Sequence, residues 1–206
     1  MKYIFVAGAP GSKWSSVVKN IYYSPSIDRS DYSDTRTYYH DASGKRELMH
    51  LGAYFDPGME FGGFFHRLPE YDYYQCEAEF DAPFSGSGVR IIKSHVFANN
   101  IGYLKKTWPD CPIVLVHRDD DACLGWWVKC GHFDITYPSY DEYYKNLRTM
   151  AGIIRQQNEG IITARLKYSG TSPTDNLGLA SALGIAPPPA EYNQNYGQSD
   201  VRVTVI

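Results

Sequence analysis

The sequence predicts an α/β fold in which a central, mostly parallel sheet is flanked by helices in three layers. Short apolar runs alternate along the chain with segments of helical periodicity, which is typical of parallel strands joined by right-handed crossovers. The runs are continuously apolar, as expected of strands covered on both faces. The 206 residues can bury one substantial core, so we expect a single domain over residues 1–206, with an aromatic-rich insert at about residues 24–88.

The first strand–helix unit has the composition of an anion-binding site. The apolar run Tyr3–Ala7 predicts a buried strand, Gly8–Ser12 is a turn of small residues, and Trp14–Tyr22 predicts a helix. Backbone N–H groups at a helix start lack intrahelical acceptors, and the helix dipole adds positive potential there. Lys13 adds a full charge, so we interpret this turn as a cradle for a phosphate or sulfate group. An ordinary strand-to-helix turn is the alternative interpretation.

The insert at about residues 24–88 is rich in Tyr, Phe, Gly, Asp and Ser and has no sustained helical period. A structureless loop of this length would be unusual in a compact domain, so we expect a lobe of short elements beside the main sheet. Three segments of it are candidate strands or helices, namely Arg36–His40, Arg46–Leu51 and Tyr71–Phe80. Its aromatic residues either line an acceptor site or form its own small core; they are Tyr38, Tyr39, Tyr54, Phe55, Phe64, Phe65, Tyr71, Tyr73 and Tyr74.

Regular alternation resumes after the insert. Four further strands are expected, at Val89–Lys93, Pro112–His117, Ile161–Leu166 and, at an edge of the sheet, Val201–Ile206. Four helices are expected between and after them, at Asn99–Trp108, Asp119–Lys129, Tyr140–Gln157 and Thr174–Leu183. We expect Gly160 to end the third of these helices and Gly184 to end the fourth.

Polar clusters follow three of the predicted strands, where ligands bind in parallel α/β sheets. They are Gly8–Lys13, Lys93-Ser94-His95 and His117-Arg118-Asp119. A neutral His95 could take a proton from a hydroxyl group, and Lys93 could hold a charged donor or developing negative charge. The alternative is that His95 caps the next helix or bonds a backbone carbonyl.

Arg118 is suited to bidentate recognition of a phosphate because its guanidinium presents donors in a planar fork. The alternative is a salt bridge to one of the three carboxylates that follow it, Asp119, Asp120 or Asp121. We expect His117 to face away from Arg118 and to be structural.

Composition excludes several classes of protein. A net charge of −3 argues against a general nucleic-acid binder, and no apolar run is long enough to span a membrane. There is no signal-peptide pattern at the N-terminus, so we expect a cytoplasmic location. The cysteines form no CxxC pair and no zinc pattern, so we expect reduced, structural thiols and no metal site; they are Cys76, Cys111, Cys123 and Cys130.

These clusters, in this order, resemble the sulfotransferases that use 3′-phosphoadenosine 5′-phosphosulfate (PAPS). The family's 5′-phosphosulfate loop, P-K/R-S-G-T-T/S, is matched in position by Pro10-Gly11-Ser12-Lys13-Trp14-Ser15. Its K-T/S-H signature is similar to Lys93-Ser94-His95, and its apolar strand ending in Arg is similar to Ile113–Asp119. A last similarity, a strand ending in Tyr, a loop with Pro and a helix ending in L-G-I/V, runs from Leu166 to Ile185.

The resemblance implies a P-loop-type fold. It implies that the chain is a short, divergent sulfotransferase of bacterial or viral type. It implies transfer of a sulfuryl group from PAPS to a hydroxyl or amine of a small-molecule or carbohydrate acceptor, leaving adenosine 3′,5′-bisphosphate and needing no metal. The catalytic residues that it implies are His95, Lys13 and Lys93. The nucleotide-binding residues that it implies are Ala9, Pro10, Gly11, Ser12, Lys13, Trp14, Ser15, Arg118 and Tyr168.

The sequence departs from the family at three points. Gly11 stands where the family has Lys or Arg, and Lys13 stands where it has Gly, so Lys13 would supply the charge from a shifted position. Trp126 stands where a second 3′-phosphate ligand, a Ser, is common, and the late Arg-Lys-Gly loop has no counterpart. Two alternative functions remain at this point.

The first alternative is a P-loop kinase or NTPase. The G-x-x-x-x-G-K-S/T motif of that class is not matched, because Ser12 precedes Lys13 and Trp14 follows it. The second is a relic of the fold that binds a nucleotide without chemistry. A retained Lys93 and His95 argue against the second, because a pure binder needs no base.

Overall fold

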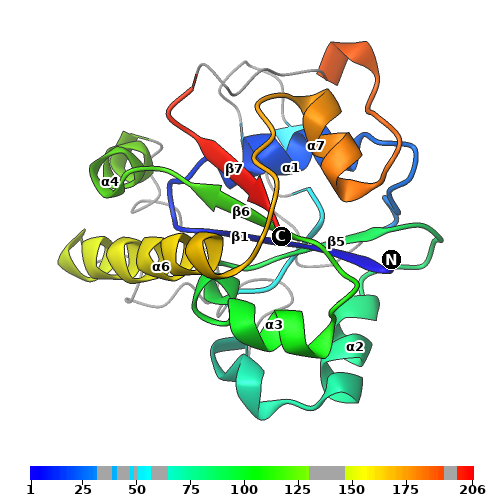
Figure 1. Cartoon of the computed structure of the whole chain (residues 1–206), viewed down its shortest axis with the longest axis horizontal. Coiled ribbons are helices and arrows are strands. Elements are labelled where there is room, and N and C mark those ends of the chain that lie inside the picture. The colour runs from blue at the N-terminus through cyan, green and yellow to red at the C-terminus, as the bar shows by residue number, and fades with distance from the viewer. Residues whose placement is uncertain (32–38, 41–46, 49–50, 57–64, 130–146, 193–198) are drawn as a thin grey trace.

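A computed structural model describes residues 1–31, 39–40, 47–48, 51–56, 65–129, 147–192 and 199–206. Its centre is a five-stranded sheet in the order β4-β5-β1-β6-β7, in which β7 alone is antiparallel to its neighbour (Figure 1). The strands are β1 (Tyr3–Gly8), β4 (Ala53–Tyr54), β5 (Arg90–Lys93), β6 (Ile113–His117) and β7 (Arg202–Val205). The chain is therefore α/β, with a mixed, mostly parallel sheet flanked by helices.

The two faces of the sheet are covered by different helices (Figure 1). Helices α1 (Trp14–Tyr22) and α7 (Asn176–Leu183) lie on one face, and α2 (Tyr73–Asp81), α3 (Ile101–Thr107) and α6 (Leu147–Lys167) lie on the other. Helix α4 (Asp120–Lys129) packs on α6 beyond the end of β6. Shorter elements are η1 (Phe65–Glu70), η2 (His95–Asn99), η3 (Ala190–Tyr192) and the antiparallel pair β2 (Tyr39–His40) and β3 (Glu47–Leu48).

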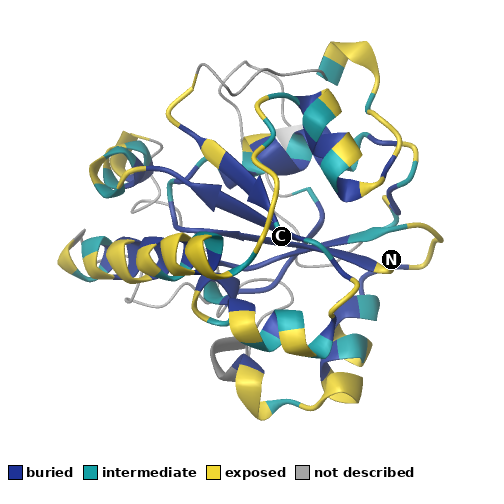
Figure 2. Ribbon diagram, viewed as in Figure 1, coloured by how far each residue is buried: buried dark blue, intermediate teal, exposed yellow. Residues whose placement is uncertain are grey.

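Strand β1 is buried along its whole length, as its continuous apolar sequence predicts (Figure 2). Alternate side chains go to opposite faces: Tyr3 and Phe5 pack with α2 and α3, whereas Ile4 and Val6 pack with α1 and α7. This pattern confirms the expectation that the central strands are covered on both sides.

The segment Ile161–Leu166 is not the strand that the sequence predicts, because α6 continues through it to Lys167. Ile161 and Ala164 are buried while Ile162 and Leu166 are exposed, which is the spacing of a helix with one apolar face. The apolar residues of this segment therefore follow a period of 3.6 rather than form a buried strand.

Gly160 does not end α6 but lets it pass close to η2. A Cβ on Gly160 would lie 2.3 Å from the carbonyl oxygen of Ala98, closer than real contacts allow. Gly184, by contrast, ends α7 as expected, with a left-handed φ of 64°. The same residue type therefore marks a close approach at one site and a helix end at the other.

Two described parts of the insert, β4 and α2, are built into the main body, whereas β2 and β3 form a two-stranded sheet of their own. Strand β4 pairs in parallel with β5 and so extends the main sheet, where the sequence suggested a separate lobe. The segment expected at Tyr71–Phe80 is helix α2, which begins with a capping box between Asp72 and Gln75. Residues 32–38, 41–46, 49–50 and 57–64 lie outside the described residues, and with them the predicted Tyr38 and Phe64.

The expected strands at Val89–Lys93, Pro112–His117 and Val201–Ile206 are confirmed as β5, β6 and β7, and the helices expected at Asn99–Trp108, Asp119–Lys129 and Thr174–Leu183 as α3, α4 and α7. Of the helix expected at Tyr140–Gln157, the part before Leu147 lies outside the described residues. Among the cysteines, Cys76, Cys111 and Cys123 are buried free thiols, and Cys130 lies outside the described residues.

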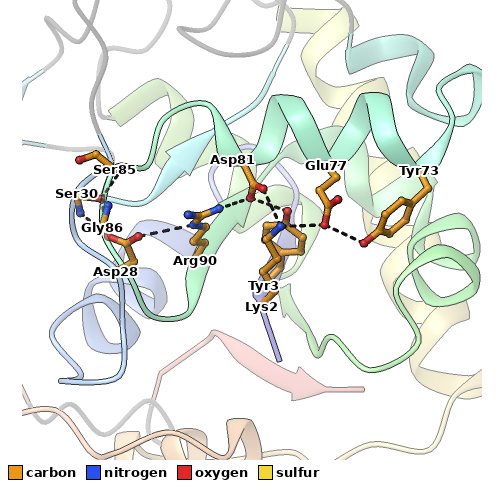
Figure 3. Close-up of polar contacts among 10 residues, drawn as sticks. All are labelled: Lys2, Tyr3, Asp28, Ser30, Tyr73, Glu77, Asp81, Ser85, Gly86 and Arg90. Carbon is orange, nitrogen blue, oxygen red and sulfur yellow. Dashed lines mark hydrogen bonds and ion pairs between the residues drawn. The ribbon is translucent and has the colours of Figure 1, made fainter.

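A polar network ties α2 to the starts of β1 and β5 (Figure 3). Lys2 Nζ lies 2.9 Å from Glu77 Oε1 and 2.7 Å from Asp81 Oδ2, and Tyr3 donates to Asp81 over 2.7 Å. Arg90 contacts both Asp81 and Asp28. The network lies at the end of the sheet opposite the three predicted polar clusters, so it fixes the fold rather than the candidate site.

Candidate functional site

The register of the sheet brings the three predicted clusters together. Val6 of β1 is paired with Lys93 of β5, and Gly8 of β1 is paired with Val116 of β6. The turn after β1 therefore lies between the residues that follow β5 and those that follow β6. This arrangement puts the predicted anion-binding loop, an imidazole and a guanidinium together at the carboxyl end of the sheet.

The loop after β1 runs so close to α4 that it has no room for a side chain at Gly11. A Cβ there would lie 2.0 Å from the carbonyl oxygen of Cys123, and the φ of Gly11 is +78°. A Lys or Arg at this position, as in the family that the sequence resembles, would collide with α4. The close approach explains why the loop carries glycine here and has its cation elsewhere.

Lys13 supplies that cation from the residue preceding helix α1. It has a left-handed φ of 62°, the only positive φ of a non-glycine residue within the described part of the chain. Its side chain makes no capping hydrogen bond to α1, and the first N–H groups of a helix have no acceptors within it. The helix start and the Lys13 ammonium therefore both contribute positive potential at the loop.

Arg118 connects the loop to α4 and to the start of β7. Its Nη1 donates to the carbonyl oxygens of Gly11, over 3.2 Å, and Ala122, over 2.8 Å. Its Nε and Nη2 lie 2.6 and 2.5 Å from Oδ2 of Asp200. The predicted salt bridge of Arg118 therefore exists, but its partner is not one of the three carboxylates that follow it in sequence.

Lys13 and Arg118 converge on the same carboxylate. Lys13 Nζ lies 3.4 Å from Oδ1 of Asp200, and both cations lie over the ring of Trp126, at 4.8 Å and 5.8 Å from its centre. Burial raises the pKa of Asp200, but hydrogen bonds and charge from Arg118 and Lys13 outweigh it and lower the pKa. The two cations of the candidate site therefore share one carboxylate of the chain itself.

His95 lies in contact with the loop after β1. Its Nδ1 is hydrogen-bonded to the carbonyl oxygen of Gly8, and its ring stacks on Trp14 with 3.9 Å between ring centres. Because a carbonyl oxygen only accepts, Nδ1 carries the hydrogen, and Nε2 of the neutral ring has a lone pair. The alternative that His95 bonds a backbone carbonyl is therefore correct for Nδ1. Nε2 remains as the nitrogen that can accept a proton.

The charge state of His95 depends on its burial, since only 3% of the residue is exposed. Burial lowers the pKa of His95; Asp56 and the Gly8 carbonyl raise it and Lys93 lowers it, and the net shift is downward. The imidazole is therefore neutral near pH 7, the form that a general base requires.

Lys93 is fully buried behind His95, with its ammonium 5.9 Å from the ring centre of Trp14 and 5.5 Å from that of Tyr54. Tyr54, an aromatic residue of the insert, meets the candidate site directly, since its ring also contacts the edge of His95. Phe55, by contrast, lies in the core on the other face. Of the two interpretations of these aromatics, a lining role therefore fits Tyr54 and a core role fits Phe55.

The remaining predicted residues of the loop are mostly buried. Ala9 packs against α4 and α6, and Pro10 is buried, while Ser15 is partly exposed on the first turn of α1. Ser12 is fully buried, and its hydroxyl has no hydrogen-bond partner among the described residues. An unpaired hydroxyl in the loop is a polar atom that a bound oxyanion could satisfy.

Tyr168 is not part of this site. It follows α6 rather than a strand, and its ring packs against the core cluster that contains Ile101 of α3, near the start of β6. Its hydroxyl faces Gly102, at 3.6 Å from an ideal Cβ there. The strand that the resemblance implies before Tyr168 is therefore wrong, because this segment is the end of a helix, and the structure does not bring Tyr168 to the loop after β1.

His117 is placed as the sequence suggests, apart from Arg118. It is buried, and burial together with the charges of Arg165 and Arg202 lowers its pKa. We assign it a structural role.

Sequence reasoning missed two residues of the site. Asp56 and Asp200 lie far from the predicted motifs in the chain, and tertiary contacts bring them to His95, Lys13 and Arg118. Trp126, which the sequence showed only as a departure from the family, lies beneath Lys13 and Arg118. One signal was available: Asp56 directly follows the apolar residues Ala53–Phe55, and a polar residue at a strand end is a candidate site residue in this class of fold.

Within the described ranges, no group of three or more His, Cys, Asp and Glu side chains could hold a metal ion. No helix in the same ranges has the length and apolar character needed to cross a membrane. Comparison with known protein families, with curated proteins and with solved structures finds no match to this chain.

Proposed function

We propose that this protein is a sulfotransferase with a P-loop-type fold, which moves a sulfuryl group from PAPS to a hydroxyl or amine acceptor. The observation that carries the proposal is that His95, Lys13 and Arg118 meet around one loop. Group transfer from an anionic donor needs cations that hold the donor and a base placed close to them.

The residues present fit one anionic group of such a donor. Lys13 and Arg118 already hold one carboxylate between them, so both can reach one phosphate or sulfate group. The unpaired Ser12 hydroxyl and the first N–H groups of α1 add neutral donors beside them. These residues would bind and orient the donor and would offset the charge that develops on its phosphate.

The transfer would form a bond between sulfur and the acceptor oxygen or nitrogen and break the bond between sulfur and the 5′-phosphate oxygen. The electron pair of the broken bond would leave with adenosine 3′,5′-bisphosphate. Nε2 of His95 would take the acceptor's proton, because Nδ1 already carries a hydrogen that Gly8 accepts. The main contributions of this chain would be positioning and charge stabilisation, as in phosphoryl transfer.

A second candidate, binding of the nucleotide without chemistry, is favoured by one observation. His95 is almost fully buried, with Trp14 stacked on its ring, so an acceptor must displace neighbouring groups to reach it. The two candidates share the anion site and differ only in whether His95 is used.

Isothermal titration calorimetry with adenosine 3′,5′-bisphosphate plus a chelator, compared with ATP plus magnesium, tests the anion site. We expect binding of the bisphosphate, and we expect Lys13→Ala to weaken it by about tenfold, or roughly 1.4 kcal/mol. Lys129→Ala is the matched control, because Lys129 also lies over Trp126, at 5.7 Å, but forms no ion pair with Asp200. Equal losses from the two variants would contradict the proposed site.

Transfer of labelled sulfate from PAPS to a panel of phenols, sugars and amines then separates the two candidates. Transfer to any acceptor supports the enzyme. Tight binding of the bisphosphate without transfer to any member of the panel supports the non-catalytic binder.

A further inference from the structure

A buried carboxylate, Asp56, lies next to His95. It follows β4, is 1% exposed, and lies at the same edge of the sheet as His95 because β4 pairs with β5. Its Oδ1 accepts hydrogen bonds from Ser94 Oγ, over 2.6 Å, and from the backbone N–H of His95, over 2.8 Å. Its Oδ2 accepts from the hydroxyl of Tyr54 over 2.8 Å.

These bonds hold the backbone of His95 together with two side chains beside it, those of Ser94 and Tyr54. Ser94 in turn accepts a hydrogen bond from the N–H of Val96, over 3.1 Å, which sets the start of η2. Asp56 thereby connects β4 to the backbone at His95, and the position of the imidazole follows from that connection.

The carboxylate also faces the basic nitrogen of the imidazole. Oδ2 of Asp56 lies 4.0 Å from Nε2 of His95, whereas Nδ1 on the far side of the ring is bonded to Gly8. The other groups that face the ring are Trp14 of α1, Tyr54 of β4 and the ammonium of Lys93 on β5. Asp56 is the carboxylate that opposes Lys93 among these groups, so it can stabilise a proton on Nε2.

We infer that Asp56 is the positioning residue for His95: it holds the backbone at His95 and stabilises the imidazolium formed when Nε2 takes the acceptor's proton, while the Gly8 carbonyl fixes the Nδ1–H tautomer. This inference rests on the proposed function for its catalytic consequence. It concerns a residue that neither the sequence motifs nor the resemblance includes. The competing explanation is that Asp56 only caps η2 and joins β4 to β5.

Three variants separate the two explanations. Asp56→Asn keeps the shape but removes the charge, whereas Tyr54→Phe and Ser94→Ala each remove one hydrogen bond to the same carboxylate and leave its charge in place. A purely structural role predicts lower melting temperatures in all three and no change in the titration of His95. A positioning role predicts a change in titration only where the charge is lost.

The first measurement needs no substrate. The nitrogen NMR signals of His95 in the full chain, assigned with His95→Gln, report its tautomer and pKa. In the wild type we expect the Nδ1–H tautomer, and in Asp56→Asn we expect the pKa to fall by about one unit or more, because an opposite charge within reach favours the charged ring. An Nε2–H tautomer in the wild type would overturn the inference even if Asp56→Asn does not fold.

The second measurement is the pH dependence of kcat for sulfuryl transfer. A base acts when deprotonated, so activity rises with pH through its pKa, and Asp56→Asn should move this acidic limb to lower pH. Its maximum kcat should fall by about 10- to 100-fold, part of the roughly 10² to 10⁴ that general-base help supplies. An unmoved limb with a lower melting temperature would show a structural role only.

The two proposals fail differently. If the wild type neither binds the bisphosphate nor transfers sulfate, the proposed function fails, while the NMR titration still tests the link between Asp56 and His95. If the wild type is active and Asp56→Asn leaves the titration and the pH profile unchanged, only the role of Asp56 fails.

Discussion

Arg118 holds one carboxylate oxygen of Asp200, Oδ2, through a hydrogen bond from Nε over 2.6 Å and an ion pair with Nη2 at 2.5 Å. Asp200 is separated from Arg118 by 82 positions in the chain and directly precedes Val201 and strand β7. Since β7 pairs with β6, the carboxylate reaches the candidate anion site from the next strand of the sheet. An acidic side chain of the chain itself thus holds the cations that a bound anion would need.

Asp200→Asn should strengthen binding of adenosine 3′,5′-bisphosphate by about tenfold, or roughly 1.4 kcal/mol. The substitution removes the negative charge that now neutralises Arg118 and Lys13. Calorimetry at constant ionic strength measures the effect. Asp121→Asn is the control, because Asp121 is an exposed acidic residue on the first turn of α4. Weaker binding in Asp200→Asn than in that control would show that Asp200 supports the site instead of competing for it.

His95→Gln should lower kcat for sulfuryl transfer by about 10² to 10⁴ while leaving affinity for the bisphosphate nearly unchanged. The imidazole would act on the acceptor's proton, whereas Lys13 and Arg118 would hold the nucleotide. Steady-state kinetics and calorimetry on the same preparation give both values. His117→Gln, at the end of β6 on the other side of β1, serves as the control for a buried imidazole outside the loop. Full activity in His95→Gln would exclude His95 as the base.

Gly11→Ala should destabilise the protein by about 1 to 3 kcal/mol and weaken anion binding, because a Cβ there meets the Cys123 carbonyl at 2.0 Å. Urea unfolding monitored by circular dichroism gives the free energy. Gly125→Ala in the same helix, α4, is the matched control, since a Cβ at that position has nothing within 4 Å. We expect it to be stabilising by about 0.5 to 1 kcal/mol. A neutral Gly11→Ala would mean that the loop does not approach α4 so closely.

Gly160→Ala and Gly152→Ala test the course of α6. Both glycines lie within the helix, but a Cβ on Gly160 meets the Ala98 carbonyl at 2.3 Å, whereas one on Gly152 has open space. Thermal unfolding should therefore show a loss of stability for Gly160→Ala and a gain of about 0.5 to 1 kcal/mol for Gly152→Ala. A gain in both variants would contradict the close packing of α6 on η2.

Asp81→Asn should lower the free energy of unfolding at pH 7 by about 1 to 3 kcal/mol, since charged partners contact this carboxylate. Burial raises the pKa of Asp81, but the hydrogen bonds from Lys2, Tyr3 and Arg90 lower it by more, so the net shift is downward. A carboxylate whose pKa is lower in the folded state stabilises the fold at pH values above its pKa in the unfolded chain, about 3.9. This stabilisation is lost as the pH falls through the pKa of the folded state.

The difference between wild type and Asp81→Asn should therefore shrink between about pH 4 and pH 2 in urea unfolding. Glu79→Gln is the control on the same helix, because Glu79 is exposed. A difference that stays constant over this range would show that the carboxylate's charge is not what stabilises α2 against the sheet.

The strands of the central sheet were predictable because their apolar runs are continuous and end in glycine or polar residues. Tyr3–Gly8, Arg90–Lys93 and Ile113–His117 lie where periodicity puts them, and the polar clusters after them therefore meet. Ile161–Leu166 was misassigned because a short apolar segment after a glycine does not distinguish a strand from a helix, and contact with η2 settles it as helix.

The amino-acid sequence by itself determined the α/β class, the small-residue loop after β1 and the presence of His95 and Arg118 at strand ends, because these depend on local pattern and on the order of elements. Only the tertiary structure decided that Asp200 sits between Lys13 and Arg118, that Asp56 faces Nε2 of His95, and that Tyr168 lies elsewhere. Such contacts join residues far apart in the chain, and they depend on strand register and helix packing, which no local pattern records.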